Sequence, residues 1–275
     1  MQRGLITVAI GKKYVTQAKY LALSCMINSS STLRAVITDF PDLLSSYYDI
    51  VINWEKDDDP FSIKTRLYDL TPFDETLFLD ADSLVFNLLD SFFLHLQNKN
   101  FVYFGDKLNS GIWYFNIKEI CKKIQAQWLP QLNSGMFLFN KSEISKDIFS
   151  KAFYYFTHHK DEGINIPFFR NNFYPDEPFF SISLALNGIE PLYDFGRFSR
   201  SLIDASDIHL NITKRIAFFN KDNLTVHPQV VHFCGKFGNI LYVSQRIKLF
   251  FYFLNPLQRF ICKVLLSINN LFHKQ

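Results

Sequence analysis

Two aspartates one residue apart, Asp80 and Asp82, follow the apolar run Thr76–Leu79. A continuous apolar run is typical of a strand that is buried on both faces of a mostly parallel sheet. Ligands of open α/β sheets bind beyond the carboxyl ends of such strands, where these carboxylates would emerge. Residues two apart on an extended chain point the same way, so both carboxylates can reach one divalent ion. Oxygen ligands of this kind suit Mg²⁺ or Mn²⁺, which keep open positions for substrate phosphates.

The same spacing occurs again at Asp57-Asp58-Asp59, in a polar stretch that no predicted strand precedes. We interpret that stretch as a solvated loop. An Asp-x-Asp spacing therefore does not identify a metal site by itself. The elements around Asp80 and Asp82 have to be considered as well.

Composition indicates a folded protein and excludes several classes of function. The chain has 275 residues, of which 48% are hydrophobic and 20% charged, so it can build a substantial core. A formal net charge of +3 is too small to indicate nucleic-acid binding.

The four cysteines are scattered, without a Cys-x-x-Cys pair, at Cys25, Cys121, Cys234 and Cys262. This pattern argues against a structural zinc site and favours reduced thiols in a cytoplasmic protein. We also expect neither a signal peptide nor a membrane-spanning helix.

The N-terminal elements follow a strand–helix–strand order. Leu5–Ile10 is predicted to be a strand, Tyr14–Ile27 a helix with apolar residues every three or four positions, and Leu33–Thr38 a second strand. A βαβ unit of this kind indicates a parallel sheet with right-handed crossovers. The turn after the first strand would then face a nucleotide, with Tyr14 near it. Simple packing at the start of the helix explains Tyr14 equally well.

A basic helix and a small polar corner lie on either side of the aspartates in the sequence. The predicted helix Ser62–Leu70 carries Lys64, which reaches the ligand end of the strand only if the helix folds back over it. A solvated lysine is the alternative. The corner Asn133-Ser134-Gly135 allows close backbone approach before an apolar strand. By itself it indicates only a transition from loop to strand.

Two later segments carry titratable side chains that structural roles also explain. Asp176 and Glu177 precede the predicted helix Phe179–Leu186, where acidic residues favour the helix dipole. His232 stands at a strand end within Gln229–Lys236, a short strand that runs into a turn. A lone histidine at such a position is more often structural than a ligand.

The order of these motifs resembles the nucleotide-sugar-dependent glycosyltransferases with the GT-A fold. It is most similar to glycosyltransferase family 8, which includes glycogenin and bacterial lipooligosaccharide galactosyltransferases. The resemblance extends from about Leu5 to Lys236 and consists of several short motifs in the right order. It implies an α/β, Rossmann-like fold with a mostly parallel central sheet flanked by helices. We expect a catalytic domain over residues 1–240 and a basic, aromatic-rich helical tail over residues 241–275.

The resemblance also implies roles for the residues that match family motifs. Asp80 and Asp82, with His232 as the third protein ligand, would hold Mn²⁺ or Mg²⁺ bound to the donor diphosphate, and imidazole is compatible with Mn²⁺. Asp176 would stand next to the reacting sugar carbon, and Asn133 would line the sugar pocket. The residues expected to contact the donor are Ala9, Tyr14, Lys64, Asp80, Ala81, Gly235 and Lys236.

Two positions depart from the family pattern. Glu177 replaces the glutamine of an Asp-Gln pair, which adds a charge near the expected reaction centre; we count it with Asp176 and Asn133 as a catalytic candidate. After the histidine the family usually continues Gly-x-x-Lys-Pro-Trp, whereas here Gly235 is followed at once by Lys236. These departures leave the choice of donor open.

The expected function is metal-dependent transfer of a sugar from a nucleotide-diphosphate donor, first of all a UDP-sugar, to a glycan or lipid-linked acceptor. The resemblance implies retention of the anomeric configuration and a role in polysaccharide or lipopolysaccharide biosynthesis. One alternative is a nucleotidyltransferase on a related sheet, but only Gly11 stands where its glycine-rich loop would be. The other is a non-catalytic sugar-nucleotide-binding protein, which the departures at Glu177 and Lys236 favour.

The C-terminal region is basic and aromatic. Residues 223–275 contain six Lys or Arg residues and no acidic residue, and the apolar runs Leu249–Leu254 and Phe260–Leu266 lie among them. Such a composition suits an interfacial helix on anionic lipid. A helix pair packed on the catalytic domain is the alternative. We expect a cytoplasmic protein, with this tail as the candidate for peripheral membrane contact.

Overall fold

The structure is a computed structural model that describes residues 1–55, 60–168, 173–193, 196–234 and 238–258. The aspartate run at 57–59, the predicted donor contacts Gly235 and Lys236, and the tail beyond residue 258 lie outside the described residues. The predicted boundary between residues 240 and 241 stays a prediction.

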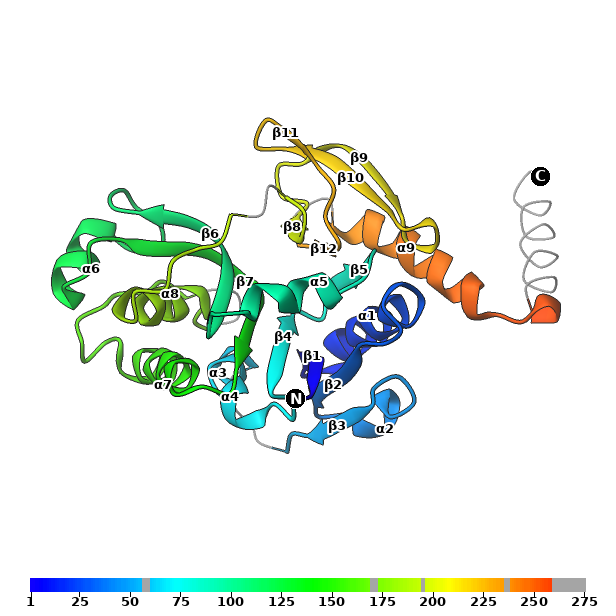
Figure 1. The fold of residues 1–275 in the computed structure, drawn as a ribbon, viewed down its shortest axis with the longest axis horizontal. Helices are drawn as coiled ribbons and strands as arrows, with labels where there is room; N and C mark the ends of the chain where they lie inside the picture. The colour runs from blue at the N-terminus through cyan, green and yellow to red at the C-terminus, as the bar shows by residue number, and fades with distance from the viewer. Residues whose placement is uncertain (56–59, 169–172, 194–195, 235–237, 259–275) are drawn as a thin grey trace.

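A six-stranded sheet with the order β3-β2-β1-β4-β7-β6 forms the centre of the fold (Figure 1). Its strands are β1 (Arg3–Ala9), β2 (Leu33–Thr38), β3 (Ile50–Asn53), β4 (Glu75–Leu79), β6 (Phe101–Leu108) and β7 (Leu129–Asn140). The first four of these run parallel to one another, and β7 runs antiparallel to both β4 and β6. The expected α/β fold with a mostly parallel central sheet is therefore confirmed.

Helices flank this sheet, and two small sheets lie beyond the carboxyl ends of its parallel strands (Figure 1). The described helices are α1 (Lys12–Asn28), α2 (Pro41–Leu44), α3 (Pro60–Lys64), α4 (Leu67–Leu70), α5 (Asp90–Phe93), η1 (Leu94–Leu96), α6 (Ile117–Ile124), α7 (Glu143–His158), α8 (Glu177–Leu186), η3 (Ile212–Lys214) and α9 (Gly238–Phe253). One small sheet contains β5 (Ser83–Val85), β12 (Val230–His232) and β8 (Ser199–Ser201). The other contains β9 (Ser206–Asn211), β10 (Ile216–Lys221) and β11 (Leu224–Val226).

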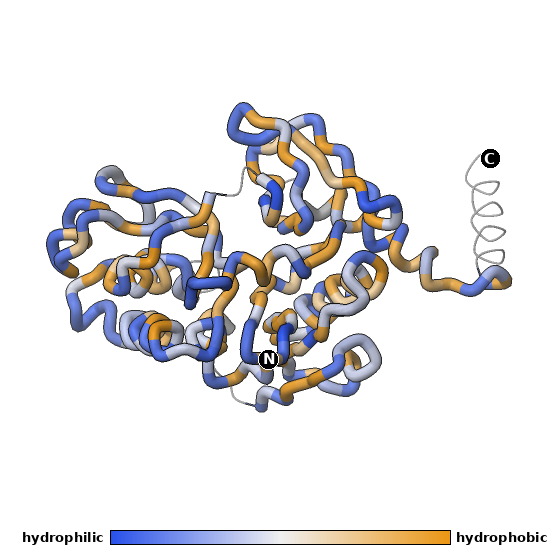
Figure 2. The backbone as a smooth tube through the Cα atoms, in the orientation of Figure 1, coloured by the Kyte–Doolittle hydropathy of each residue, from blue (hydrophilic) through white to orange (hydrophobic). Residues whose placement is uncertain are grey.

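The strand β4 is apolar along its length because its two faces enter two different cores. Leu77 packs in a cluster that includes Leu21 of α1, whereas Phe78 packs with Phe137 of β7 and Phe149 of α7. The rings of Phe78 and Phe137 are stacked, with centroids 4.8 Å apart. Hydrophobic residues accordingly run through the central strands in Figure 2. This double burial fixes the end of β4, from which the aspartates emerge.

Two predicted elements differ from the observed ones. The predicted helix Ser62–Leu70 is divided into α3 and α4, and Thr65 between them donates its hydroxyl hydrogen to the Ser62 carbonyl oxygen. Such side-chain bonds to the backbone compete with a continuous helix. The Asn133-Ser134-Gly135 corner lies inside β7 and not before it, since that strand already begins at Leu129.

Candidate metal and donor site

Asp80 and Asp82 lie in the short connection between β4 and β5, at the carboxyl end of the central strand. The Ser83 N–H donates to the Asp80 carbonyl oxygen, which closes a tight turn. His232 ends β12, which pairs antiparallel with β5 so that His232 lies opposite Ser83. The same pairing lets the Phe233 N–H donate to the Asp82 carbonyl oxygen. The two small strands thus bring a distant histidine to the two aspartates.

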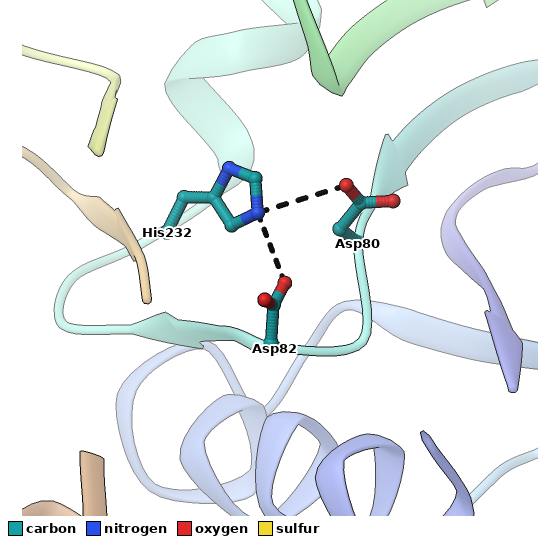
Figure 3. Close-up of side chains that lie close together, drawn as sticks. All are labelled: Asp80, Asp82 and His232. Carbon is teal, nitrogen blue, oxygen red and sulfur yellow. Dashed lines mark ion pairs between the residues drawn. The ribbon is translucent and has the colours of Figure 1, made fainter. Parts of the chain in front are cut away.

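The three side chains point toward one another (Figure 3). His232 Nε2 lies 3.0 Å from Asp82 Oδ1 and 3.6 Å from Asp80 Oδ2. One candidate ligand atom from each residue falls within 4.8 Å of the other two. Two carboxylate oxygens and one imidazole nitrogen form a donor set that Mn²⁺ accepts, and these three residues leave coordination positions for phosphate oxygens. The residues present therefore fit the expected divalent cation.

The charges of these three groups depend on one another. Burial disfavours a charged imidazole, but Asp82, followed by Cys234 and Asp80, raises the pKa of His232 well above its ordinary value. Burial likewise disfavours a charged Asp82, but the attraction and hydrogen bond of His232 lower the pKa of that carboxyl. Without a cation both pKa shifts favour an imidazolium beside a carboxylate. A metal-ligating histidine must be neutral, so a bound cation would displace this proton.

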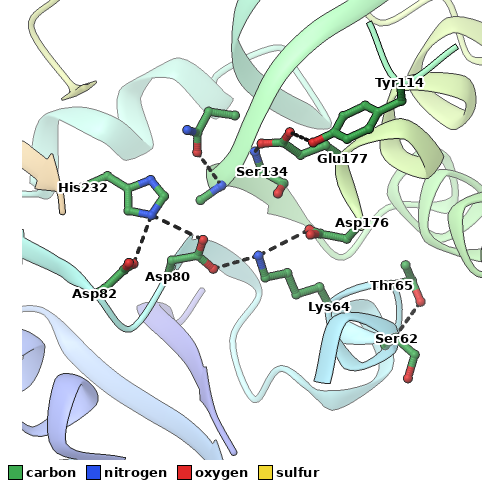
Figure 4. Close-up of polar contacts among 12 residues, drawn as sticks. Ser62, Lys64, Thr65, Asp80, Asp82, Tyr114, Ser134, Asp176, Glu177 and His232 are labelled. Carbon is green, nitrogen blue, oxygen red and sulfur yellow. Dashed lines mark hydrogen bonds and ion pairs between the residues drawn. The ribbon is translucent and has the colours of Figure 1, made fainter. Parts of the chain in front are cut away.

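Asp80, Asp82 and His232 are called the metal group below. Lys64 connects this group to Asp176 (Figure 4). Its Nζ lies 2.7 Å from Asp80 Oδ1 and 3.3 Å from Asp176 Oδ2, and 5.2 Å from the ring centre of Phe78. Burial alone would lower the pKa of Lys64, but Asp176 and then Asp80 raise it, so the side chain stays an ammonium. The sequence led us to expect a contact with the donor. The structure places this ammonium between two carboxylates of the site.

Glu177 and Asn133 hold the polar corner of β7 in place. One carboxylate oxygen of Glu177 accepts from the Tyr114 hydroxyl at 2.7 Å, and the other accepts from the Ser134 N–H at 3.2 Å. The Asn133 side-chain oxygen accepts from the Gly135 N–H at 2.8 Å. Burial, and then the adjacent carboxylate of Asp176, raises the pKa of Glu177. With both oxygens engaged, Glu177 positions the corner.

The corner contacts the metal group directly. The Asp80 N–H donates to the Gly135 carbonyl oxygen at 2.9 Å, so β7 fixes the backbone of the first aspartate. Tyr114 completes the set through Glu177, and it was not predicted because nothing in the residues around it points to Glu177. Its role is visible only once the loop before α6 is placed beside α8.

The structure describes three of the other predicted donor contacts, namely Ala9, Tyr14 and Ala81. Ala9 ends β1 and shares a buried cluster with Ala81, directly beside the aspartates. Tyr14 lies on the first turn of α1 with 44% of its surface exposed, and Lys13 Nζ is 5.5 Å from its ring centre. An exposed aromatic ring at this edge of the sheet is available to a ligand. Its role in binding a nucleotide base stays a prediction.

A cavity of about 640 Å³ adjoins the site. Asn133, Glu177 and His232 are among the residues that line it, together with residues of β8 and Lys221 of β10. The cavity therefore reaches from Glu177 and His232 to the small sheets.

Comparison with solved structures identifies the fold. No protein-family model and no curated protein matches the sequence. An active-site mutant of LgtC, in which glutamate replaces glutamine, matches with a TM-score of 0.57 and 15% identity over 88% of this chain and 95% of that one. Mouse xyloside xylosyltransferase 1 matches with a TM-score of 0.51 and 10% identity over 84% of this chain and 97% of that one. The bifunctional glycosyltransferase WbbM matches with a TM-score of 0.51 and 9% identity over 86% of this chain.

The chain spans only 46% of the length of WbbM. At these identities the likeness establishes a shared fold, and the same fold can host different activities. The chain has the GT-A fold of the glycosyltransferases that it resembles, as the sequence motifs predicted. What it does must be argued from the site.

Proposed function

We propose that this chain is a divalent-cation-dependent glycosyltransferase. Its donor would be a nucleotide-diphosphate sugar, first of all a UDP-sugar, and its acceptor a glycan or lipid-linked sugar. The observation that carries the proposal is the convergence of Asp80, Asp82 and His232 at the end of β4. The glycosyltransferase fold of the neighbouring structures supports it.

Each part of the site suits a step of sugar transfer. A divalent cation held by Asp80, Asp82 and His232 would offset the negative charge that collects on the departing diphosphate. The reacting sugar carbon becomes positive as its bond to the diphosphate breaks, and the carboxylate of Asp176 would stabilise that charge. Asp176 is only 3% exposed, so little water weakens its electrostatic effect. Glu177 holds the β7 corner that lines the sugar pocket.

We propose retention of the anomeric configuration on the strength of the family resemblance. In a retaining reaction the new bond forms on the face of the sugar from which the diphosphate leaves. The acceptor would approach through the 640 Å³ cavity, which Asn133 and Glu177 help to line.

Contact with an anionic lipid surface is proposed for α9. One face of this helix is buried against the rest of the protein through Tyr242, Gln245 and Leu249. The opposite face exposes apolar side chains spaced three or four residues apart, at Ile240, Val243, Ile247 and Phe250. The surrounding sequence is free of acidic residues from position 223 onward. An exposed apolar stripe in a basic environment suits anionic lipid. None of the described helices is both long enough and apolar enough to span a bilayer.

Calorimetric titration of UDP, with and without Mn²⁺, tests the proposed reaction. We expect Mn²⁺-dependent UDP binding by the wild type, and we expect Asp82→Ala to abolish it. The matched control is Asp161→Ala, which removes an exposed aspartate just beyond α7 and should bind like the wild type.

UDP binding that survives Asp82→Ala would exclude the metal group as the cation site. Wild-type protein that binds GDP or CDP but not UDP would correct the donor base. Hydrolysis of the matching nucleotide sugar, followed by transfer, then identifies the sugar.

A further inference from the structure

Asp80 lies between the side chains of Lys64 and His232. Its Oδ1 lies 2.7 Å from the ammonium of Lys64, and its Oδ2 lies 3.6 Å from His232 Nε2. The Lys64 side chain is only 9% exposed, so solvent screens this ion pair weakly. A divalent ion bound to Asp80 would therefore meet the repulsion of a nearby fixed positive charge.

Lys64 has a second carboxylate within reach. Asp176 Oδ2 is buried and forms an ion pair with Lys64 Nζ at 3.3 Å, but no described residue donates it a hydrogen bond of regular geometry. A buried carboxylate oxygen without a well-aligned donor is unfavourable, so a donor that moved closer to it would stabilise it. A small shift of the ammonium away from Asp80 and toward Asp176 would supply that donor.

We propose that Lys64 is an internal counter-ion that competes with the divalent cation for Asp80. In the empty site it neutralises Asp80. When the cation binds together with a nucleoside diphosphate, Lys64 shifts its pairing to Asp176. The inference rests on the proposed function, because it takes Asp80, Asp82 and His232 as the cation site.

This arrangement makes binding of the cation depend on the donor. The cation alone must overcome the charge of Lys64, whereas the phosphates of the donor add the negative charge that compensates it. Cation and nucleotide therefore bind cooperatively, and by linkage each raises the affinity of the other equally. The same event leaves Asp176 paired with Lys64 beside the reacting sugar carbon.

A simpler role for Lys64 predicts the opposite result. A group that only orients a ligating carboxylate strengthens metal binding, and its loss typically weakens the affinity. A competing cation weakens metal binding, and its loss strengthens the affinity. The sign of one measurement distinguishes the two roles.

The experiment measures the affinity for Mn²⁺ by electron paramagnetic resonance, with and without UDP. For Lys64→Met without UDP we expect at least about tenfold tighter Mn²⁺ binding, and a correspondingly smaller gain on adding UDP. The control is Lys107→Met, which breaks the surface pair of Lys107 with Glu190 and should leave both affinities unchanged. Unchanged or weaker Mn²⁺ binding by folded Lys64→Met would overturn the inference.

A second pair of variants covers the case in which Lys64→Met does not fold because it leaves Asp176 buried without a counter-ion. Asp176→Asn leaves Lys64 to Asp80 alone, so it should bind Mn²⁺ more weakly than the wild type. The double variant Lys64→Met/Asp176→Asn strands no buried charge on Asp176 and should bind Mn²⁺ at least about tenfold more tightly than Asp176→Asn. Equal affinities in these two variants would overturn the inference. A wild type that binds no Mn²⁺ even with UDP would overturn the proposed function itself.

Discussion

Gly135 and His232 are in direct contact, with no room for a side chain between them. A Cβ atom on Gly135 would lie 2.6 Å from Cε1 and 2.7 Å from Nδ1 of the His232 ring. It would also lie 2.7 Å from Asn133 Oδ1, so we expect Gly135→Ala to push both side chains away and to shift the ring from Asp80 and Asp82. We expect the affinity for Mn²⁺ in the presence of UDP to fall roughly ten- to 100-fold, which calorimetry measures. Ser134→Ala adds no atom at the neighbouring position and should preserve the affinity. An unchanged affinity in Gly135→Ala would contradict the placement of His232.

Asp176→Asn should separate catalysis from donor binding. The carboxylate of Asp176 is proposed to stabilise positive charge that develops only as the sugar bond breaks. Its loss should therefore lower kcat roughly 100-fold or more, whereas the affinity for UDP with Mn²⁺ should fall by a much smaller factor, because Lys64 then pairs with Asp80 alone. Single-turnover hydrolysis of the nucleotide sugar and titration of UDP give the two values. Equal losses in both would assign Asp176 to donor binding.

Glu177 should make stability depend on pH. A carboxyl group whose pKa is raised by folding binds its proton more tightly in the folded state, so stability falls as the pH rises through that pKa. Glu177→Gln removes this penalty and keeps an acceptor for the Ser134 N–H. Urea unfolding should therefore show a gain over the wild type at about pH 8 that shrinks toward about pH 4.

The control for that measurement is Glu190→Gln on the protein surface. The hydrogen bond and charge of Lys107 lower the pKa of Glu190, so its effect has the opposite sign. Its substitution should slightly destabilise the protein at about pH 8 and have less effect at about pH 4. A gain from Glu177→Gln that is equal at both pH values would contradict the raised pKa.

Phe137 should be among the residues on which the fold depends most. Its fully buried ring lies 4.8 Å from that of Phe78 and 5.2 Å from that of Phe180, measured between centroids. Phe137→Ala should lower the free energy of unfolding by about 3–5 kcal/mol, which urea titration measures. Phe153→Ala on α7, where the ring is 40% exposed, should cost less than about 1 kcal/mol. Comparable losses in both variants would contradict this packing.

The exposed stripe of α9 should govern lipid binding. Serine at Val243, Ile247 and Phe250 removes apolar surface and leaves the buried face of the helix intact. We expect flotation with phosphatidylserine-containing vesicles to fall roughly tenfold. The control replaces three exposed leucines elsewhere with serine, at Leu43, Leu88 and Leu94. Equal flotation of the two triple variants, or equal binding of the wild type to uncharged vesicles, would contradict the proposal.

Two of the three residues of the metal group, Asp80 and Asp82, could be proposed from the local sequence alone. An apolar strand that ends in Asp80 and Asp82 places two carboxylates at a ligand edge by local geometry alone. His232 could be added only through the family resemblance, since nothing near it in the sequence names its partners. The structure supplies the missing reason, which is the antiparallel pairing of β12 with β5.

Long-range partners explain what the sequence could not provide. The Asn133–Gly135 corner looked like a loop because its small polar residues favour turns, yet it lies within β7. Its polar groups are satisfied by Asp80 and Glu177, which are distant in sequence. The pairing of Lys64 with Asp176 likewise depends on how α3 and α8 pack, which no local pattern encodes.

The pairing of β12 with β5 also affects how the protein is made. Asp80 and Asp82 leave the ribosome well before β12, because His232 lies 150 residues after Asp82 in the chain. Until it docks, β5 lacks a neighbour and the two carboxylates lack their imidazole. A growing or prematurely terminated chain therefore carries only part of the metal group and should not sequester the cation or the sugar donor. Contacts between residues so far apart in the chain also tend to slow folding.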